Sequence, residues 1–322
     1  MQLFRDILVG VDLSSVDPQA GVELTAPNQQ ALDRAIWLAS RTQENLTIFS
    51  CIHIYPYVRE ALQRELEGSR LESEGRKILE GFVARAKIEG VHARSKLVFG
   101  VPWEEICLQV QSDEHDLVII GTRDLGRAGR FLFGSTGMKL LRNCPCPIWV
   151  TRPDAHWDHV NVLVPSDFSD VSLEALRLAV NVGQLFDTRI HVLHAFERPV
   201  GPPAWYGYVS KQMVEDRTAA QRAEADKKLH EQLARTDYRT LRHGAQVHVV
   251  DGPADEAILK AIDDFQIGLV VMGTAARSGL AGLALGNTTE RLVSQMRCSL
   301  MAVKPAGFRC TITPTPKPGF EL

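Results

Sequence analysis

Short runs of apolar residues alternate along the chain with longer segments in which apolar residues recur at helical spacing. Residues 7–9 and 117–120 are continuous apolar runs, which are typical of strands buried on both faces of a parallel sheet. Residues 31–39 carry apolar positions at intervals of three and four, so a helix is predicted after the first strand. This alternation of strands and helices indicates a doubly wound α/β fold.

The same pattern occurs twice along the chain. Residues 6–11 read Asp-Ile-Leu-Val-Gly-Val, and residues 161–166 read Asn-Val-Leu-Val-Pro-Ser. Residues 117–122 read Leu-Val-Ile-Ile-Gly-Thr, and residues 269–274 read Leu-Val-Val-Met-Gly-Thr. An internal repeat predicts two copies of one structural unit, each with a five-stranded parallel sheet.

The length of 322 residues accommodates two domains of about 150 residues, each large enough to bury its own core. The predicted division is a first domain at residues 1–152, a linker at 153–159, a second domain at 160–305 and a Pro-rich, disordered tail at 306–322. The last strands, near residues 148–150 and 300–303, could pair within the chain as an intramolecular pseudo-dimer, which would cover the exposed edges of both sheets.

The first half has a longer loop after its first strand. The spacing from Asp12 to Ala31 exceeds the spacing from Asp167 to Ala175 by 11 residues, which fall within residues 14–28. This loop leaves the carboxyl end of a central strand, where open α/β sheets bind ligands. It is either a lid or, as we favour, a surface insertion, since loops tolerate changes in length at small cost.

Composition excludes several classes of protein. The 45% of hydrophobic and 23% of charged residues are ordinary for globular domains, and the net charge of −3 argues against a dominant nucleic-acid surface. No apolar run reaches about 18 residues, and the beginning of the chain lacks a signal-peptide pattern. Six cysteines in so long a chain are not a disulfide framework. A cytoplasmic protein without a membrane or nucleic-acid partner is expected.

A glycine-rich loop follows the fourth strand of the first half, with the spacing Gly121-x-x-Asp124, nine residues, then Gly134-Ser135. Together with the opening Ile-Leu-Val-x-Val-Asp and with Cys-Pro-Ile-x-Val at residues 146–150, this loop resembles the signature of the universal stress protein family. The duplication makes the chain similar to tandem members of the E type.

The physical chemistry of this loop suits an anion. Glycine lets backbone amides approach a ligand because no Cβ intervenes, and the following helix supplies free N–H groups. The resemblance implies an adenine nucleotide such as ATP, which Mg²⁺ could accompany, with adenine near the first strand and phosphates at the glycine motif. The positions implied in the first half are Gly10, Asp12, Ile120, Gly121, Asp124, Gly134, Ser135 and Thr136. Their second-half equivalents are Pro165, Asp167, Met272, Gly273, Ala276, Gly286, Asn287 and Thr288.

Asp124 departs from the family signature, which has glycine at this position. A carboxylate about 5 Å from a phosphate would cost roughly 3 kcal/mol at an effective dielectric constant near 20. Arg123, Arg127, Arg130 or a divalent cation could offset that repulsion. Alternatively, and in our preferred interpretation, Asp124 turns outward and bonds the loop backbone.

The second half departs further. Ala276 replaces the second glycine, and Asn287 removes the hydroxyl group found at Ser135. Asn287 followed by Glu290 is a variant of the capping box, so a helix start explains it without a ligand. The first half is therefore the better candidate site, and the second is interpreted as degenerate.

Other motifs are given structural interpretations. The segment Gly129 to Thr136 lacks the lysine of a phosphate-binding P-loop. Cys144-Pro-Cys146 is interpreted as buried and structural, because buried thiols behave as small apolar groups. His191 and His194 are three apart on a strand and point to opposite faces, so no shared metal is predicted.

These observations favour a non-catalytic, cytoplasmic stress-response protein that binds an adenine nucleotide, if any, in its first domain. Two alternatives are a slow ATP hydrolase using a cation near Asp124, and a nucleotide-free module that holds an apolar ligand or a protein. Neither the protein partner nor assembly into a homo-oligomer follows from the residues.

Overall fold

The computed structural model describes residues 4–16, 22–55, 69–122, 133–153, 160–185, 188–197, 211–274 and 286–312. The chain divides into two compact units. Among the described residues, the first unit contains those within 4–153, residue 274 and residues 306–312, and the second contains those within 160–273 and 286–305. The pairing of the last strands, near residues 148–150 and 300–303, stays a prediction.

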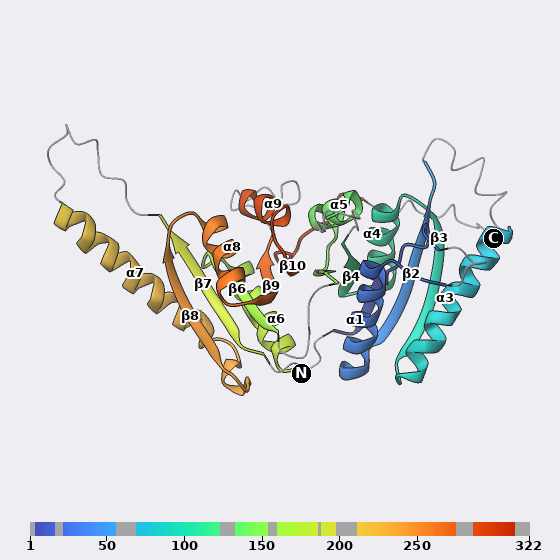
Figure 1. Cartoon of the computed structure of the whole chain (residues 1–322), viewed down its shortest axis with the longest axis horizontal. Coiled ribbons are helices and arrows are strands. Elements are labelled where there is room, and N and C mark those ends of the chain that lie inside the picture. Colours follow the sequence, from blue (N-terminus) through green and yellow to red (C-terminus); the bar gives the residue numbers. More distant parts are fainter. Residues whose placement is uncertain are drawn as a thin grey trace, which may run out of the picture. The chain divides into compact units, whose positions relative to one another are not determined.

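The first unit is a parallel sheet with strand order β3-β2-β1-β4-β5. Its elements are β1 (Asp6–Gly10), α1 (Ala26–Thr42), β2 (Asn45–His53), α3 (Arg70–Ile88), β3 (His92–Gly100), α4 (Pro102–Asp113), β4 (Leu117–Gly121), α5 (Ser135–Asn143) and β5 (Ile148–Thr151) (Figure 1). Right-handed crossovers place α1 and α3 together on one face and α4 and α5 together on the other.

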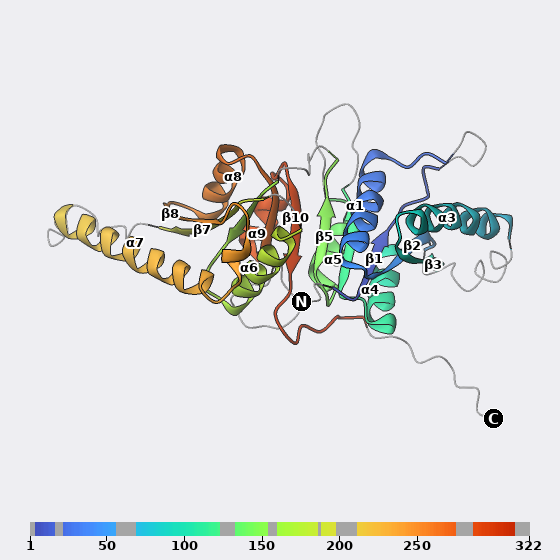
Figure 2. The same ribbon diagram turned by 90° about the horizontal axis from the view of Figure 1, so that it is seen from below.

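The second unit repeats this topology with the order β10-β9-β6-β7-β8. Its elements are β6 (Asn161–Pro165), α6 (Asp170–Gly183), β7 (Ile190–Phe196), α7 (Lys211–Leu233), β8 (Ala245–Asp251), α8 (Ala254–Asp264), β9 (Ile267–Gly273), α9 (Asn287–Val293) and β10 (Ser299–Val303). The helices α3 and α7 lie against the outer strands β3 and β8 of their own units (Figure 2). The prediction of two doubly wound α/β sheets is confirmed.

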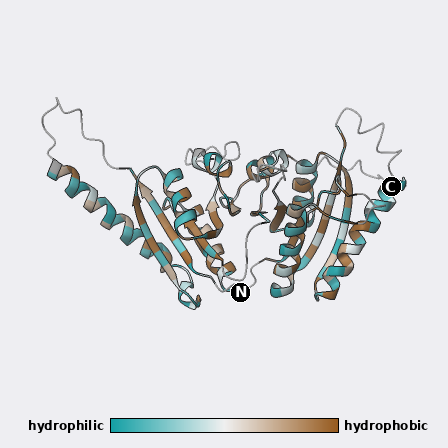
Figure 3. Ribbon diagram, viewed as in Figure 1, coloured by the Kyte–Doolittle hydropathy of each residue, from teal (hydrophilic) through white to brown (hydrophobic). Residues whose placement is uncertain are grey.

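The core of each unit lies along its central strands. Ile7, Leu8 and Val9 are fully buried, as are Leu163 and Val164 in the second unit. Brown, hydrophobic colour follows the strands, and teal follows much of the outer helical surface (Figure 3). Burying a Leu or Val side chain of this kind stabilises the fold by about 2 kcal/mol, so the duplicated apolar runs account for the two sheets.

The segment after β10 returns to the first unit. Gln111 Nε2, on α4, donates to the carbonyl oxygen of Ile312 at 3.1 Å, and Thr311 Oγ1 donates to Asn143 Oδ1 at 2.7 Å. The tail was expected to be disordered from residue 306. Instead, these contacts hold it against α4 and α5 as far as Ile312. The physical reason is that side chains of α4 and α5 satisfy its backbone and its hydroxyl group. Residues 313–322 lie outside the described residues.

Candidate functional site

The predicted residues of the first half meet at the carboxyl edge of the sheet. Gly10, at the end of β1, pairs with Ile120 of β4. A Cβ atom on Gly10 would lie 3.1 Å from Ile120 Cγ2. A Cβ atom on Gly137, in the first turn of α5, would lie 3.6 Å from Ile120 Cδ1. The Ile120 side chain therefore connects the end of β1 with the beginning of α5, and the strand end and the glycine motif are neighbours.

Gly121 is required by helix packing. A Cβ atom at this position would lie 2.4 Å from the carbonyl oxygen of Pro27 and 3.1 Å from the backbone nitrogen of Asn28. Both distances are shorter than any ordinary contact, and the groups involved are backbone atoms that cannot rotate away. Gly121 thus lets the first turn of α1 rest on the end of β4, which fixes the wall of the candidate site.

No described residue accepts a hydrogen bond from the amides in the first turn of α5. Gly134 is the N-cap residue, and no side chain caps this helix. The amides of the first turn, beginning at Ser135, have no acceptor within the helix. No acidic residue lies in this turn, so nothing there opposes the positive end of the helix dipole. Ser135 is exposed and Thr136 is half-buried, and their hydroxyl groups add two further donors.

Asp12 and Asp167 occupy equivalent places after the first strand of each unit. Asp12 Oδ1 accepts a hydrogen bond from the Ser14 amide at 2.8 Å, and Asp167 Oδ1 accepts from the Ser169 amide at 3.1 Å. Each aspartate thus closes a turn over the residue two positions ahead. Asn28 Nδ2 also donates to the Asp12 carbonyl oxygen at 3.3 Å, which ties the end of the 14–28 loop to the strand. Both aspartates have a structural role at this edge.

Several predicted positions fall outside the described residues. Asp124 and the arginines that could offset its charge lie in residues 123–132, and Ala276 lies in residues 275–285. The orientation of Asp124 therefore stays a prediction. Residues 17–21 of the inserted loop are also outside the described residues, so the choice between a lid and a surface insertion stays open.

The equivalent edge of the second unit is built differently. Pro165 stands in place of Gly10 and has no N–H, and the pairing between β6 and β9 runs from Asn161 to Leu163 only. The other predicted positions lie at the end of β9, which contains Met272 and Gly273, and at the beginning of α9, where Gly286, Asn287 and Thr288 lie. A Cβ atom on Gly273 would lie 2.7 Å from Val171 Cγ1, so this glycine also serves helix packing.

The predicted capping role of Asn287 is wrong. Gly286 is the N-cap residue of α9, and Asn287 is the first residue inside the helix. Gly286 has φ −61° and ψ 141°, the extended backbone geometry usual for a residue at this position. The helix has only 7 residues, and Glu290 in its first turn opposes an anionic ligand.

Protein side chains fill the space after β6. Ser166 Oγ donates to Gln232 Oε1 at 2.6 Å and lies 3.2 Å from Ser172 Oγ, and all three side chains are buried. Phe168, which has φ +66°, places its ring 4.2 Å from the ring of His194. These residues were not predicted from the sequence, because Ser166 and Gln232 are 66 positions apart and only the fold unites them.

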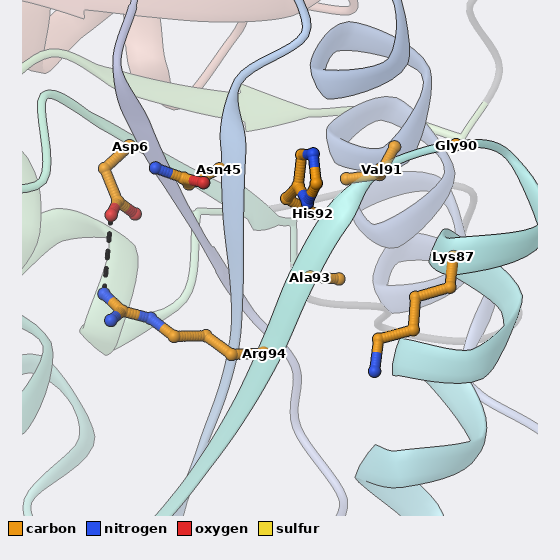
Figure 4. A pocket seen from close by; sticks show the side chains of 8 residues that line it. All are labelled: Asp6, Asn45, Lys87, Gly90, Val91, His92, Ala93 and Arg94. Carbon is orange, nitrogen blue, oxygen red and sulfur yellow. Dashed lines mark hydrogen bonds and ion pairs between the residues drawn. The ribbon is translucent and has the colours of Figure 1, made fainter.

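A surface hollow of about 580 Å³ lies at the opposite, amino edge of the first sheet (Figure 4). Its lining residues are Asp6, Asn45, Lys87, Gly90, Val91, His92, Ala93 and Arg94. Arg94 Nη2 reaches Asp6 Oδ2 at 3.4 Å and Asp113 Oδ2 at 3.1 Å, so its charge is already balanced. None of the predicted site residues lines this hollow.

His115 also belongs to the amino edge. Its buried side chain places Nδ1 2.7 Å from Asp6 Oδ1, and Nε2 lies 3.2 Å from Gln109 Nε2. Within the described part of the chain, no cluster of histidine, cysteine, aspartate or glutamate side chains has the geometry of a metal site. None of the helices that the structure describes has the length and apolar character needed to cross a membrane.

Comparison with known proteins agrees with this architecture. The model of the universal stress protein family matches residues 3–152 and again residues 160–304. The chain belongs to the universal stress protein family. It is 25% identical to Universal stress protein E of Photorhabdus laumondii over 339 residues, covering 97% of this chain and 98% of that protein. Universal stress protein E of Escherichia coli is 25% identical over 338 residues, with the same coverage of 97% and 98%.

Solved structures show the same fold. A protein of unknown function from Pseudomonas aeruginosa is 20% identical, has a TM-score of 0.67, and covers 94% of each chain. A universal stress protein from Archaeoglobus fulgidus is 17% identical, has a TM-score of 0.64, and covers 93% of this chain and 98% of that chain. The fold is thus shared along nearly the whole chain.

Proposed function

We propose that the chain is a non-catalytic stress-response protein whose first domain binds an adenine nucleotide, with ATP as the expected ligand. One observation carries the proposal. Through Ile120, the end of β1 and the uncapped first turn of α5 are held beside one another at the carboxyl edge of the sheet. Open α/β sheets bind ligands at this edge, on the two sides of the point where strand order reverses.

The first turn of α5 would bind the phosphates. Three first-turn amides and the hydroxyl groups of Ser135 and Thr136 are donors, and a phosphate carries acceptors only. The half-buried Gly10 and the backbone around Asp12 would flank the base. If Asp124 faces the phosphates, an Mg²⁺ ion bound with them would reduce its repulsion.

The second domain is proposed to be degenerate. Ser166 and Gln232 occupy buried space after β6, and Pro165 removes a backbone donor. The acidic Glu290 in the short helix α9 further disfavours phosphate. A nucleotide would have to displace hydrogen-bonded side chains there, whereas no described side chain caps the amides of α5 in the first domain.

Catalysis receives no support from the described residues at this edge. The buried His115–Asp6 pair, which could act as a base, lies at the opposite edge of the first sheet. The edge near α5 provides backbone donors and hydroxyl groups, which bind charge without activating a nucleophile.

A proline substitution at the first helical position tests the proposal. Ser135→Pro deletes the first amide of α5 and its hydroxyl group, while proline fits this position and Gly134 before it is already extended, at ψ 167°. We expect ATP binding, measured by calorimetry on the full chain with Mg²⁺, to weaken at least about tenfold, the value of one charge-assisted hydrogen bond. Ser135→Ala, which removes only the hydroxyl group, should have a smaller effect.

Asn287→Pro is the matched control, because Asn287 holds the same helical position in α9. It should leave the affinity and the stoichiometry of one nucleotide unchanged. The proposal fails if the wild-type chain binds no adenine nucleotide, or if Asn287→Pro weakens binding as much as Ser135→Pro does.

A further inference from the structure

Four of the six cysteines gather at one place in the first unit. Cys144 and Cys146 lie in the turn between α5 and β5, and their Sγ atoms are 3.7 Å apart. The Cys107 thiol, on α4, interacts with the thiols of Cys144 and Cys310. Cys310 comes from the segment after β10, which is more than two hundred residues away from Cys107 along the chain.

The segment that carries Cys310 is held in position. Gln111, one helical turn after Cys107, donates to the carbonyl oxygen of Ile312 at 3.1 Å. Thr311 donates to Asn143, the residue before Cys144, at 2.7 Å. The Ile312 amide donates to Cys310 Sγ at 3.4 Å. These hydrogen bonds hold the residues just after Cys310 in place. The Cys310 thiol can therefore reach Cys107 with little further ordering of the chain.

The four thiols differ in access to solvent. Cys107, Cys144 and Cys146 are buried, whereas Cys310 is half-exposed. The hydrogen bond with Cys144, followed by burial, raises the pKa of the Cys107 thiol, which stays protonated at neutral pH. Because a soluble oxidant reacts with accessible thiolate, Cys310 is the group that reacts first.

We propose that this cluster is a thiol-oxidation site, in which a peroxide converts Cys310 and Cys107 into a disulfide. Cys310 loses its thiol proton, and the thiolate attacks one peroxide oxygen. The S–O bond of a sulfenic acid forms, the O–O bond breaks, and the leaving hydroxide takes up a proton as the first water. Cys107 sulfur then attacks Cys310 sulfur and gives up its proton in the same step. The S–S bond forms, the S–O bond breaks, and the leaving hydroxide takes up that proton as a second water. Two thiols are oxidised by two electrons, and hydrogen peroxide is reduced to two waters.

The structural consequence is a covalent fastening of residues 306–312 to α4. The second unit ends at residue 305, and the following segment belongs to the first unit. The disulfide would add a covalent link to the hydrogen bonds that hold this segment. Cellular thiols can reduce such a link again. Disulfides of this kind in a reducing compartment are transient and sense redox state.

Peptide mapping of the full chain tests the proposal. The chain is treated with hydrogen peroxide under native conditions, remaining thiols are blocked with N-ethylmaleimide, and the protein is digested with trypsin without reduction. The lysines and arginines of the sequence place Cys107, Cys310 and the Cys144–Cys146 pair on three separate peptides. We expect a cross-linked Cys107–Cys310 peptide that disappears on reduction, and faster migration of the intact chain on a non-reducing gel.

Two variants separate this site from general oxidation. Cys310→Ser, at a half-exposed position, should fold normally and lose the cross-link and the gel shift. Cys51→Ser, at the half-exposed cysteine of β2, should keep both. Formation of a Cys144–Cys146 disulfide in place of the cross-link would overturn the proposal. So would conversion of Cys310 to its sulfinic acid with Cys107 still a free thiol.

Discussion

Acid should destabilise the second unit through a buried histidine. His191, on β7, is only 4% exposed, and its Nδ1 lies 3.0 Å from Nε2 of His248 on β8. Both rings stack against Phe265, with centroid distances of 4.6 and 4.5 Å. Burial, and then the charges of His248 and Arg189, lower the pKa of His191 from 6.5 to about 4. Burial also lowers the pKa of His248.

The sign and size of the effect follow from proton linkage. The unfolded chain protonates His191 near pH 6.5, whereas the folded chain keeps this ring neutral down to about pH 4. Stability from the neutral ring is therefore complete above pH 6.5 and declines as the pH falls towards 4. The full difference in pKa between the folded and unfolded chain corresponds to about 3 kcal/mol of unfolding free energy. About 2 kcal/mol of this is lost between pH 7.5 and pH 5.

Urea denaturation at pH 7.5 and at pH 5 measures this loss, with hydrogen exchange of the β7 and β8 peptides to assign it to the second unit. His191→Phe preserves a ring against Phe265 and removes the titration, so it should lose about 2 kcal/mol less than the wild type between these two pH values. His230→Gln is the control, because His230 is exposed on α7. A wild-type chain equally stable at both pH values, or an unchanged pH dependence in His191→Phe, would refute the reasoning.

Two further substitutions, the first of them with a control, test the packing of the two edges. Gly121→Ala would press a methyl group against the Pro27 carbonyl oxygen, 2.4 Å away, and should cost about 3 kcal/mol in urea denaturation. Gly81→Ala, an exposed helical position with no atom within 4 Å of the added group, should instead stabilise by about 1 kcal/mol; equal effects would contradict the packing argument. Ser166→Ala leaves the buried Gln232 oxygen without its donor and should cost about 2 kcal/mol, and an unchanged thermal midpoint would show that the network contributes nothing.

The fold could be predicted from the sequence because a strand that is buried on both faces of a sheet must consist of apolar residues. Residues 7–9 and 117–120 have to be apolar throughout, and their repetition at 162–164 and 269–272 indicated the second copy. Loop residues obey no such constraint. The capping role assigned to Asn287 was wrong because glycine and asparagine both take the cap position, and sequence does not decide between adjacent residues.

The candidate site was harder to interpret because a glycine can be required either by a bound ligand or by close helix packing. A glycine at Gly121 suits an approaching phosphate, and it equally suits an approaching helix backbone; the structure shows the second at Pro27. Contacts between distant segments were not predictable at all. Ser166 with Gln232, and Cys107 with Cys310, have no periodicity or spacing that joins them, since the fold alone sets their separation.

The duplication supplies an internal comparison that a single domain would lack. Asp12 and Asp167 make the same bond to the residue two positions ahead, although only the first domain is proposed to bind nucleotide. An aspartate retained at both edges in the same turn is explained by the turn. What differs between the halves is the strand end beside it, Gly10 against Pro165, together with the side chains that fill the second edge. Nucleotide affinity should therefore depend on the glycine at position 10 and on the amides of the first turn of α5 more than on the carboxylate of Asp12.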